Sequence, residues 1–184
     1  MCWTEERTLF IVMDYYPMTL KDKLVEKLEE TEILHFFKQL MKGLKHIHEA
    51  GVIHFDIKPD NLFIDEFNNL KIGDFGLAAS TGESYGENFA GFVCFDTYFR
   101  APEMQYLSRN LTNKVDIFSA GAVLLEMVIS PAMNAFDKMS AFEDAAMGLF
   151  PEVVDADIAQ FLKQCLAQDS NKRPSANEIL SMKF

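Results

Sequence analysis

The chain has 184 residues, 49% hydrophobic and 24% charged, which favours one soluble globular domain over a disordered segment. Its formal net charge of −11 makes nucleic acid and anionic membrane surfaces poor partners, because both repel a negative surface. No stretch approaches the roughly 20 apolar residues of a membrane helix, and three scattered cysteines predict reduced thiols and a cytoplasmic or nuclear location.

The first third of the chain predicts a strand and two helices. The sequence "TLFIVMDYY" (8–16) predicts a β-rich strand that ends at Pro17. "TLKDKLVEKL" (19–28) predicts a short helix. From Thr31 onward apolar residues recur at helical spacing for several turns, which predicts an amphipathic helix that ends at Gly51.

The remainder predicts one hairpin and further helices. "NLFID" and "NLKIG" are short strands on either side of "EFNN", and a glycine-dotted loop follows over about 77–103. Residues 115–128 are apolar nearly all round, which is typical of a helix buried in the core. Residues 157–166 predict another amphipathic helix, and "SANEIL" has capping-box spacing at the start of a last one. The expected fold class is mainly α with small β-hairpins.

Four polar residues around this hairpin have the chemistry of a metal–polyphosphate site. Asp56, Asn61 and Asp74 offer hard oxygen ligands, and Lys58 offers a point positive charge. Such a set suits Mg²⁺, which takes few protein oxygens and leaves positions for substrate phosphates. The order H-x-D-x-K-x-x-N, then D-F-G, then A-P-E is that of the catalytic loop, metal loop and activation segment of protein kinases.

The chain therefore resembles a eukaryotic-type protein kinase over essentially its whole length. The resemblance implies that residues 15–184 are the large, C-terminal lobe with the hinge, and that residues 1–14 are a remnant of the small lobe. Most of the small lobe would be missing, and only its last strands and the hinge would be present. ATP and Mg²⁺ are the implied cofactors, and a hydroxyl group of a protein substrate is the implied phosphate acceptor.

The resemblance assigns a role to each motif residue. Asp56 resembles the base that orients the substrate hydroxyl and accepts its proton, and Lys58 would neutralise charge on the moving phosphoryl group. Asn61 and Asp74 would hold Mg²⁺. The resemblance also implies that backbone groups of Asp14 and Tyr16 bind adenine beside the gatekeeper Met13, and that Phe63 forms an apolar floor beneath it. Asp116 would support the catalytic loop, and Glu103 would form an ion pair with Arg173. His54 is expected to have a structural role, packed behind the catalytic loop beside Phe75.

Two departures from the usual kinase pattern suggest a subgroup. Phe55 stands where most kinases carry an Arg that binds a phosphate on the activation loop, so phosphorylation is not expected to switch this chain through that contact. Asp96 stands where Ser/Thr kinases usually have Thr. Both features resemble the Wee and Myt kinases, which phosphorylate cyclin-dependent kinases in the cell cycle. Phe95 and Arg100 depart from that subgroup, and initiation-factor-2α kinases and other Ser/Thr groups are alternatives. Lys58 does not settle whether Ser, Thr or Tyr is the acceptor.

The 184 residues contain neither a Gly-x-Gly-x-x-Gly loop nor a V-A-I-K lysine before the hinge strand. In kinases these parts cover and position the phosphates, so we expect a truncated catalytic domain that is inactive or nearly so by itself. Two alternatives belong to other classes of protein. One is a free-standing mimic of the large lobe that binds and regulates another kinase. The other is a pseudokinase scaffold that binds nucleotide weakly or not at all.

Overall fold

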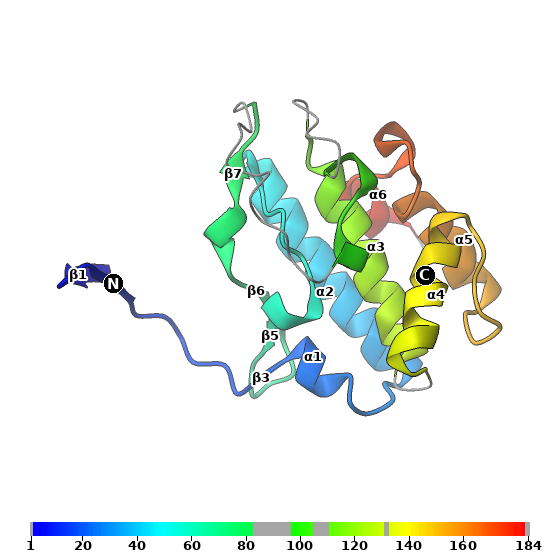
Figure 1. The fold of residues 1–184 in the computed structure, drawn as a ribbon, viewed down its shortest axis with the longest axis horizontal. Helices are drawn as coiled ribbons and strands as arrows, with labels where there is room; N and C mark the ends of the chain where they lie inside the picture. The colour runs from blue at the N-terminus through cyan, green and yellow to red at the C-terminus, as the bar shows by residue number, and fades with distance from the viewer. Residues whose placement is uncertain (1, 83–96, 105–110, 131–132, 183–184) are drawn as a thin grey trace.

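The computed structural model describes residues 2–82, 97–104, 111–130 and 133–182. Two long helices lie side by side at the centre of the molecule, and shorter helices pack around them (Figure 1). Helix α3 contacts α2, α4 and α5, while α6 contacts α2. The bounds of the helices are Leu20–Lys23 (α1), Glu30–Glu49 (α2), Lys114–Ile129 (α3), Ala135–Ala146 (α4), Ala156–Cys165 (α5) and Ala176–Ser181 (α6).

Helix α2 confirms the amphipathic helix expected from Thr31, and it begins one residue earlier. A reciprocal capping box between Glu29 and Glu32 closes its N-terminus. Gly51 follows its end with φ +73°, a left-handed conformation that glycine adopts without steric cost. The face turned to the core is apolar and consists of Ile33, Phe36, Phe37, Leu40, Met41 and Leu44.

Helix α3 confirms the buried helix expected over 115–128. Nearly every residue from Val115 to Ile129 is buried, because α2, α4 and α5 cover it on several sides. Gly121 permits the close approach of α5: a Cβ at this position would lie 2.7 Å from Cβ of Cys165. The absence of a side chain here therefore sets how near the two helices can pack.

The predicted hairpin is present as strands β5 (Leu62–Ile64) and β6 (Leu70–Ile72), paired antiparallel. The short strand β3 (Met18–Thr19) adds to β5. The turn between β5 and β6 is held by Asp65, whose Oδ1 accepts hydrogen bonds from two backbone amides of the turn. A second small pair joins β4 (Val52–Ile53) to β7 (Ala79–Ser80). Strand β7 lies inside the region 77–103 that was expected to be a loop.

The N-terminal hairpin consists of β1 (Cys2–Glu5) and β2 (Thr8–Ile11). All its strand residues are exposed, and Figure 1 shows it apart from the helical body. The predicted strand over 8–16 was too long. It ends at Ile11, opposite Cys2, the first residue of its partner β1, because further strand residues have no described neighbour to complete a ladder of hydrogen bonds.

Two further expectations need correction. The helix predicted over 19–28 is a single turn: Thr19 caps it, and the chain leaves helical geometry after Lys23 so that Leu24 and Leu28 can both reach the core. Helix α4 was not expected, although Asn134 caps it by accepting two backbone hydrogen bonds.

Phe95 and Asp96 lie outside the described residues. Within the described ranges, no helix is both long and apolar enough to cross a membrane.

Candidate active site

The loop after β4 is held by one buried carboxylate of α3. Asp116 has no exposed surface and accepts three hydrogen bonds, from Nε2 of His48 at 2.8 Å and from the backbone amides of His54 and Phe55 at 2.9 Å each. Phe55 has φ +67°, a strained conformation for a bulky residue, and its ring is buried. The bonds to Asp116 offset this strain and fix the start of the loop.

Asp56 lies on this loop with two partners from the residues that follow. Nδ2 of Asn61 donates to Oδ2 of Asp56 at 2.7 Å and to its backbone carbonyl at 2.8 Å, and Nζ of Lys58 lies 3.2 Å from the same Oδ2. The carboxylate is therefore oriented through one oxygen. Within the described residues, Oδ1 of Asp56 and Oδ1 of Asn61 accept no hydrogen bond, so both are available to ligands.

The loop that carries Asp74 is tied directly to this first loop. The amide of Gly73 donates to the carbonyl of Asn61 at 2.9 Å. His54 donates from Nε2 to the carbonyl of Gly73 at 3.0 Å and accepts at Nδ1 from the amide of Asp56, so both ring nitrogens are engaged and the tautomer is fixed. Asp74 follows in left-handed geometry, with φ +57°, and is exposed. These bonds bring Asn61 and Asp74, the two expected metal ligands, onto adjoining loops.

Aromatic contacts surround the two loops. The rings of His54 and Phe75 meet edge to face with centroids 4.8 Å apart. Phe63 of β5 lies 5.8 Å from the ring of Tyr16, and a Cβ at Gly73 would collide with the Phe63 ring at 2.5 Å. Asp14 is exposed in the extended segment between β2 and β3. Phe63 and Tyr16, two of the residues expected to contact adenine, are thus neighbours.

Glu103 and Arg173 form a bidentate ion pair with N–O distances of 2.6 and 2.8 Å. The guanidinium is buried, and its remaining donors reach backbone carbonyls, among them that of Ala167 at 2.8 Å. Its carbon also lies 5.0 Å from the ring centroid of Phe118. The pair joins the segment around A-P-E to the C-terminal helices with its buried charge well satisfied.

The donors present suit magnesium and a nucleotide. Within the described ranges, no three His, Cys, Asp or Glu side chains converge as a metal site. An ion here would take oxygens from Asn61 and Asp74 and leave its other positions to phosphate or water, the pattern that Mg²⁺ favours. When bound, Mg²⁺–ATP supplies the phosphoryl group and neutralises its charge.

Sequence reasoning missed two polar contacts of this site. His48 was expected to have a structural role without a named partner, and its position four residues after the buried Leu44 was the available signal that it faces the core. Ser119 of α3 donates to the carbonyl of Phe99 at 2.5 Å and so holds the end of the segment before A-P-E. No periodicity in the sequence indicates that second contact.

Comparisons with known proteins place the chain in a family. The protein kinase domain model matches residues 1–184. The chain is 32% identical over 188 residues to Eukaryotic translation initiation factor 2-alpha kinase 1 of Plasmodium falciparum, which covers 95% of this chain and 12% of the relative. It is 32% identical over 201 residues to human eIF-2-alpha kinase GCN2, with 94% and 12% covered.

A third relative is Serine/threonine-protein kinase CLA4 of Candida albicans, 30% identical over 189 residues, with 97% of this chain and 19% of the relative covered. The chain thus spans between 12% and 19% of the length of these curated relatives. With its mainly helical architecture and the ordered loops described above, the chain belongs to the protein kinase domain family, a family of phosphotransferases whose relatives here include Ser/Thr kinases.

Proposed function

We propose that the catalytic domain containing these residues transfers the γ-phosphoryl group of ATP to a hydroxyl group of a protein substrate. The observation that carries the proposal is the arrangement of Asp56 and Lys58 on a loop that Asp116 holds in place. A carboxylate and an ammonium group fixed side by side provide a proton acceptor and a positive charge at one point, the two functions that phosphoryl transfer needs from side chains.

The two oxygens of Asp56 have different surroundings, and this gives each a function. Oδ2 is held by Asn61 and Lys58, so it orients the carboxylate. Oδ1 is available to accept the proton of the substrate hydroxyl as the hydroxyl oxygen attacks the γ-phosphorus. The bond from the γ-phosphorus to the bridging oxygen breaks in the same transfer, and ADP leaves. Lys58 then neutralises negative charge on the transferred group. Because these groups are positioned before the substrate arrives, little reorganisation is needed during the reaction.

The remaining motif residues bind the nucleotide in this proposal. Oδ1 of Asn61 and the carboxylate of Asp74 are the proposed magnesium ligands. Phe63 forms the apolar floor under adenine, and backbone groups of Asp14 and Tyr16 hydrogen-bond its edge. Residues 1–14 form the last strands of the small lobe, and residues 15–184 form the large lobe with the hinge.

The finer proposal concerns the substrate. Phe55 and Asp96 support a Wee- or Myt-like kinase that acts on a cyclin-dependent kinase. The three relatives described above give that subgroup no support, and two of them are named as kinases of initiation factor 2α. We therefore keep an initiation-factor-2α kinase as the competing proposal. Phosphorylation of purified cyclin-dependent kinase, but not of purified initiation factor 2α, by the full-length protein would decide for the first; the opposite result would decide for the second.

The test of the general function is a phosphotransfer assay on the full-length protein with Mg²⁺ and labelled ATP. Asp56→Asn and Asp74→Asn are each expected to lower kcat by at least about 100-fold, because each removes a group needed in the transition state. Asp144→Asn, an acid on α4 away from the site, is the matched control. Retention of most activity in Asp56→Asn would contradict the proposed base.

A second candidate function is a non-catalytic binding module, and the exposed N-terminal hairpin favours it. Leu9, Ile11 and Met13 are at least 60% exposed. Exposed apolar surface of this kind is typical of sites that bind another polypeptide. In a mimic of the large lobe or a pseudokinase scaffold, the bound polypeptide would be a partner kinase. Mg²⁺–ATP added to the full-length protein separates the candidates: a rise in Tm that disappears in Asp74→Asn supports the enzyme, and no rise in Tm supports the binding module.

A further inference from the structure

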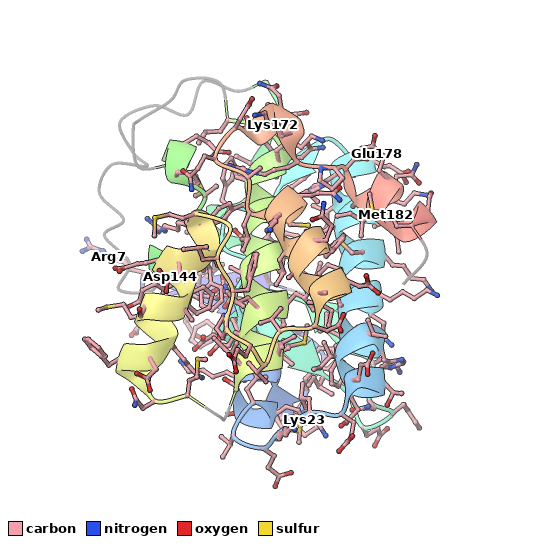
Figure 2. All side chains as sticks on the ribbon, turned by 90° about the vertical axis from the view of Figure 1, so that its right-hand side faces the viewer. Arg7, Lys23, Asp144, Lys172, Glu178 and Met182 are labelled. Carbon is pink, nitrogen blue, oxygen red and sulfur yellow. The ribbon has the colours of Figure 1, made fainter. Side chains whose placement is uncertain are left out.

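A groove runs along α2, separate from the candidate active site. None of its lining residues belongs to the loops described above. It has two adjoining compartments of about 430 Å³ each, within the range of about 300–1,000 Å³ typical of ligand pockets. The compartments share Leu34, Phe37 and Met182 as a common wall. Figure 2 shows this face, with α5 and α2 on either side and Met182 beside α6.

The first compartment lies between α2 and α6 and is apolar. Met41 and Ile179 line it, and Lys38 is its one charged lining residue among those described. The second compartment lies between α2 and α5, with Ile158 and Phe161 in its lining. Each compartment therefore offers enough apolar surface to take a side chain of the size of leucine or phenylalanine.

The rim of the second compartment is acidic. Glu30 begins α2, and Asp155 and Asp157 lie at the start of α5; all three are exposed and line this compartment. Within the described parts of the chain none of them forms an ion pair. Acids are favourable in the first turn of any helix, which accounts for each residue separately. This preference for acids does not explain why the N-termini of α2 and α5 both line the same apolar compartment.

We propose that this groove docks a peptide segment of a partner protein that carries two apolar anchors a few residues apart, with Lys or Arg beside the anchor in the α2–α5 compartment. The apolar side chains supply burial in the two compartments. The basic side chains meet the unpaired acids of the rim, which gives charge complementarity and fixes the direction in which the peptide lies. The proposal is independent of the proposed catalysis.

Fluorescence polarisation tests it with the full-length protein and a labelled peptide, Arg-Lys-Ser-Leu-Gly-Ser-Leu. Saturable binding that weakens with added salt is expected, because the charge pairs are exposed. Glu30→Lys/Asp157→Lys should raise the Kd of the peptide by about tenfold or more. Asp137→Lys/Glu143→Lys, the same change of charge on α4, is the matched control and should leave the Kd within about twofold. A peptide in which Glu replaces Arg and Lys should not bind.

Three results would overturn the proposal. The first is equal binding of the basic and the acidic peptide. The second is an equal loss of binding in both double variants, which would mean that general surface charge is responsible. The third is binding that appears or tightens when residues 183–184 are deleted, which would assign the groove to the chain itself. Ile158→Ala provides a second check, since loss of an apolar wall should weaken the peptide without any change in charge.

Discussion

Asp116 is the residue on which the geometry of the candidate active site depends most directly. Its carboxylate is fully buried on α3, and it accepts three hydrogen bonds from outside that helix. The donors are His48 on α2 and the backbone amides of His54 and Phe55, at the start of the loop that carries Asp56. An ionised carboxylate accepts hydrogen bonds and cannot donate them, and all three partners of Asp116 are donors. The match of charge, burial and donors makes this position intolerant of an isosteric amide.

Asp116→Asn is therefore expected to lower the free energy of unfolding by about 1–3 kcal/mol, because an amide NH₂ would face a donor in a buried setting. Urea unfolding measures the change. Asp144→Asn, on the surface of α4, should change stability by less than about 0.5 kcal/mol. Equal stability of the two variants would show that the carboxylate is not needed to hold the loop.

Cys165 gives a prediction about alkaline pH. Burial raises the pKa of its thiol from 9.0 to about 12, since the thiolate would have to form in the apolar core. Between pH 9 and pH 12 the unfolded chain loses this proton while the folded chain keeps it. The thiol's contribution to stability is thus complete below pH 9 and declines as the pH rises towards 12.

The matched variant is Cys165→Ala, which lacks the ionisable group. The stability advantage of the natural protein over this variant should shrink above pH 9, by at most about 1.4 kcal/mol per pH unit. Urea unfolding under reducing conditions from pH 7 to pH 10.5 measures it. An advantage that stays constant over this range would mean that the buried thiol does not titrate as the structure implies.

The sequence pattern was most informative for elements whose structure is determined by residues within one short segment. Helices α2 and α3 and the β5–β6 hairpin were predicted because periodicity, caps and turn residues agree within one segment. The predicted strand 8–16 and helix 19–28 were too long, because their true ends depend on pairing and on core packing elsewhere in the chain. Likewise, the motif spacing indicated Asn61 and Asp74, but the hydrogen bond between Gly73 and Asn61 that joins their two loops is a tertiary contact.

The contact between α3 and α5 provides a test at the level of elements. Gly121→Ala raises helix propensity by about 1 kcal/mol, but its Cβ would lie 2.7 Å from Cβ of Cys165 and 3.2 Å from Cδ2 of Leu166. A Cβ on a packed helix cannot rotate away, so overpacking should prevail and the free energy of unfolding should fall by about 1–2 kcal/mol.

Gly43→Ala on α2 is the matched control, because the added Cβ meets only atoms of one movable side chain, Cδ1 of Ile72 at 2.7 Å and its Cγ1 at 3.3 Å. Rotation of that side chain relieves the contact, and the gain in helix propensity should leave stability unchanged or slightly raised. Thermal unfolding of both variants measures the difference. A Gly121→Ala protein as stable as the Gly43→Ala protein would show that α5 can move away from α3 at little cost.

At the scale of the whole molecule, the described residues form a helical body with one core and a hairpin that stands apart from it (Figure 1). The hairpin's Trp3 and Phe10 stack on each other at 5.0 Å, yet both remain at least 39% exposed. Phe75, which directly follows Asp74, is 49% exposed. Apolar groups of the hairpin and of Phe75 are thus available to a covering layer of structure. Under the proposed function, this layer is the kinase small lobe.

This arrangement predicts that the 184 residues by themselves bind and turn over nucleotide poorly. Phe63, the proposed floor for adenine, and the loops of Asp56 and Asp74 are present, but these 184 residues contain no Gly-x-Gly-x-x-Gly loop to cover the phosphates. Ligands in functional pockets bury about 70–90% of their surface, and a site with a floor and one edge buries much less. Phosphoryl transfer relies on positioning, so the loss of cover should reduce kcat more than it reduces binding.

The comparison is between the 184 residues alone and the same residues joined to a kinase small lobe, under the same conditions, with labelled ATP and a protein acceptor. The 184 residues alone should show less than about 1% of the kcat of the joined protein, since misplaced phosphates cost at least about 100-fold. Their Tm should also rise less with Mg²⁺–ATP. Comparable turnover by the 184 residues alone would mean that the two loops position the phosphates without a covering lobe, and the mechanism proposed for Asp56 and Lys58 would then have to account for the whole rate.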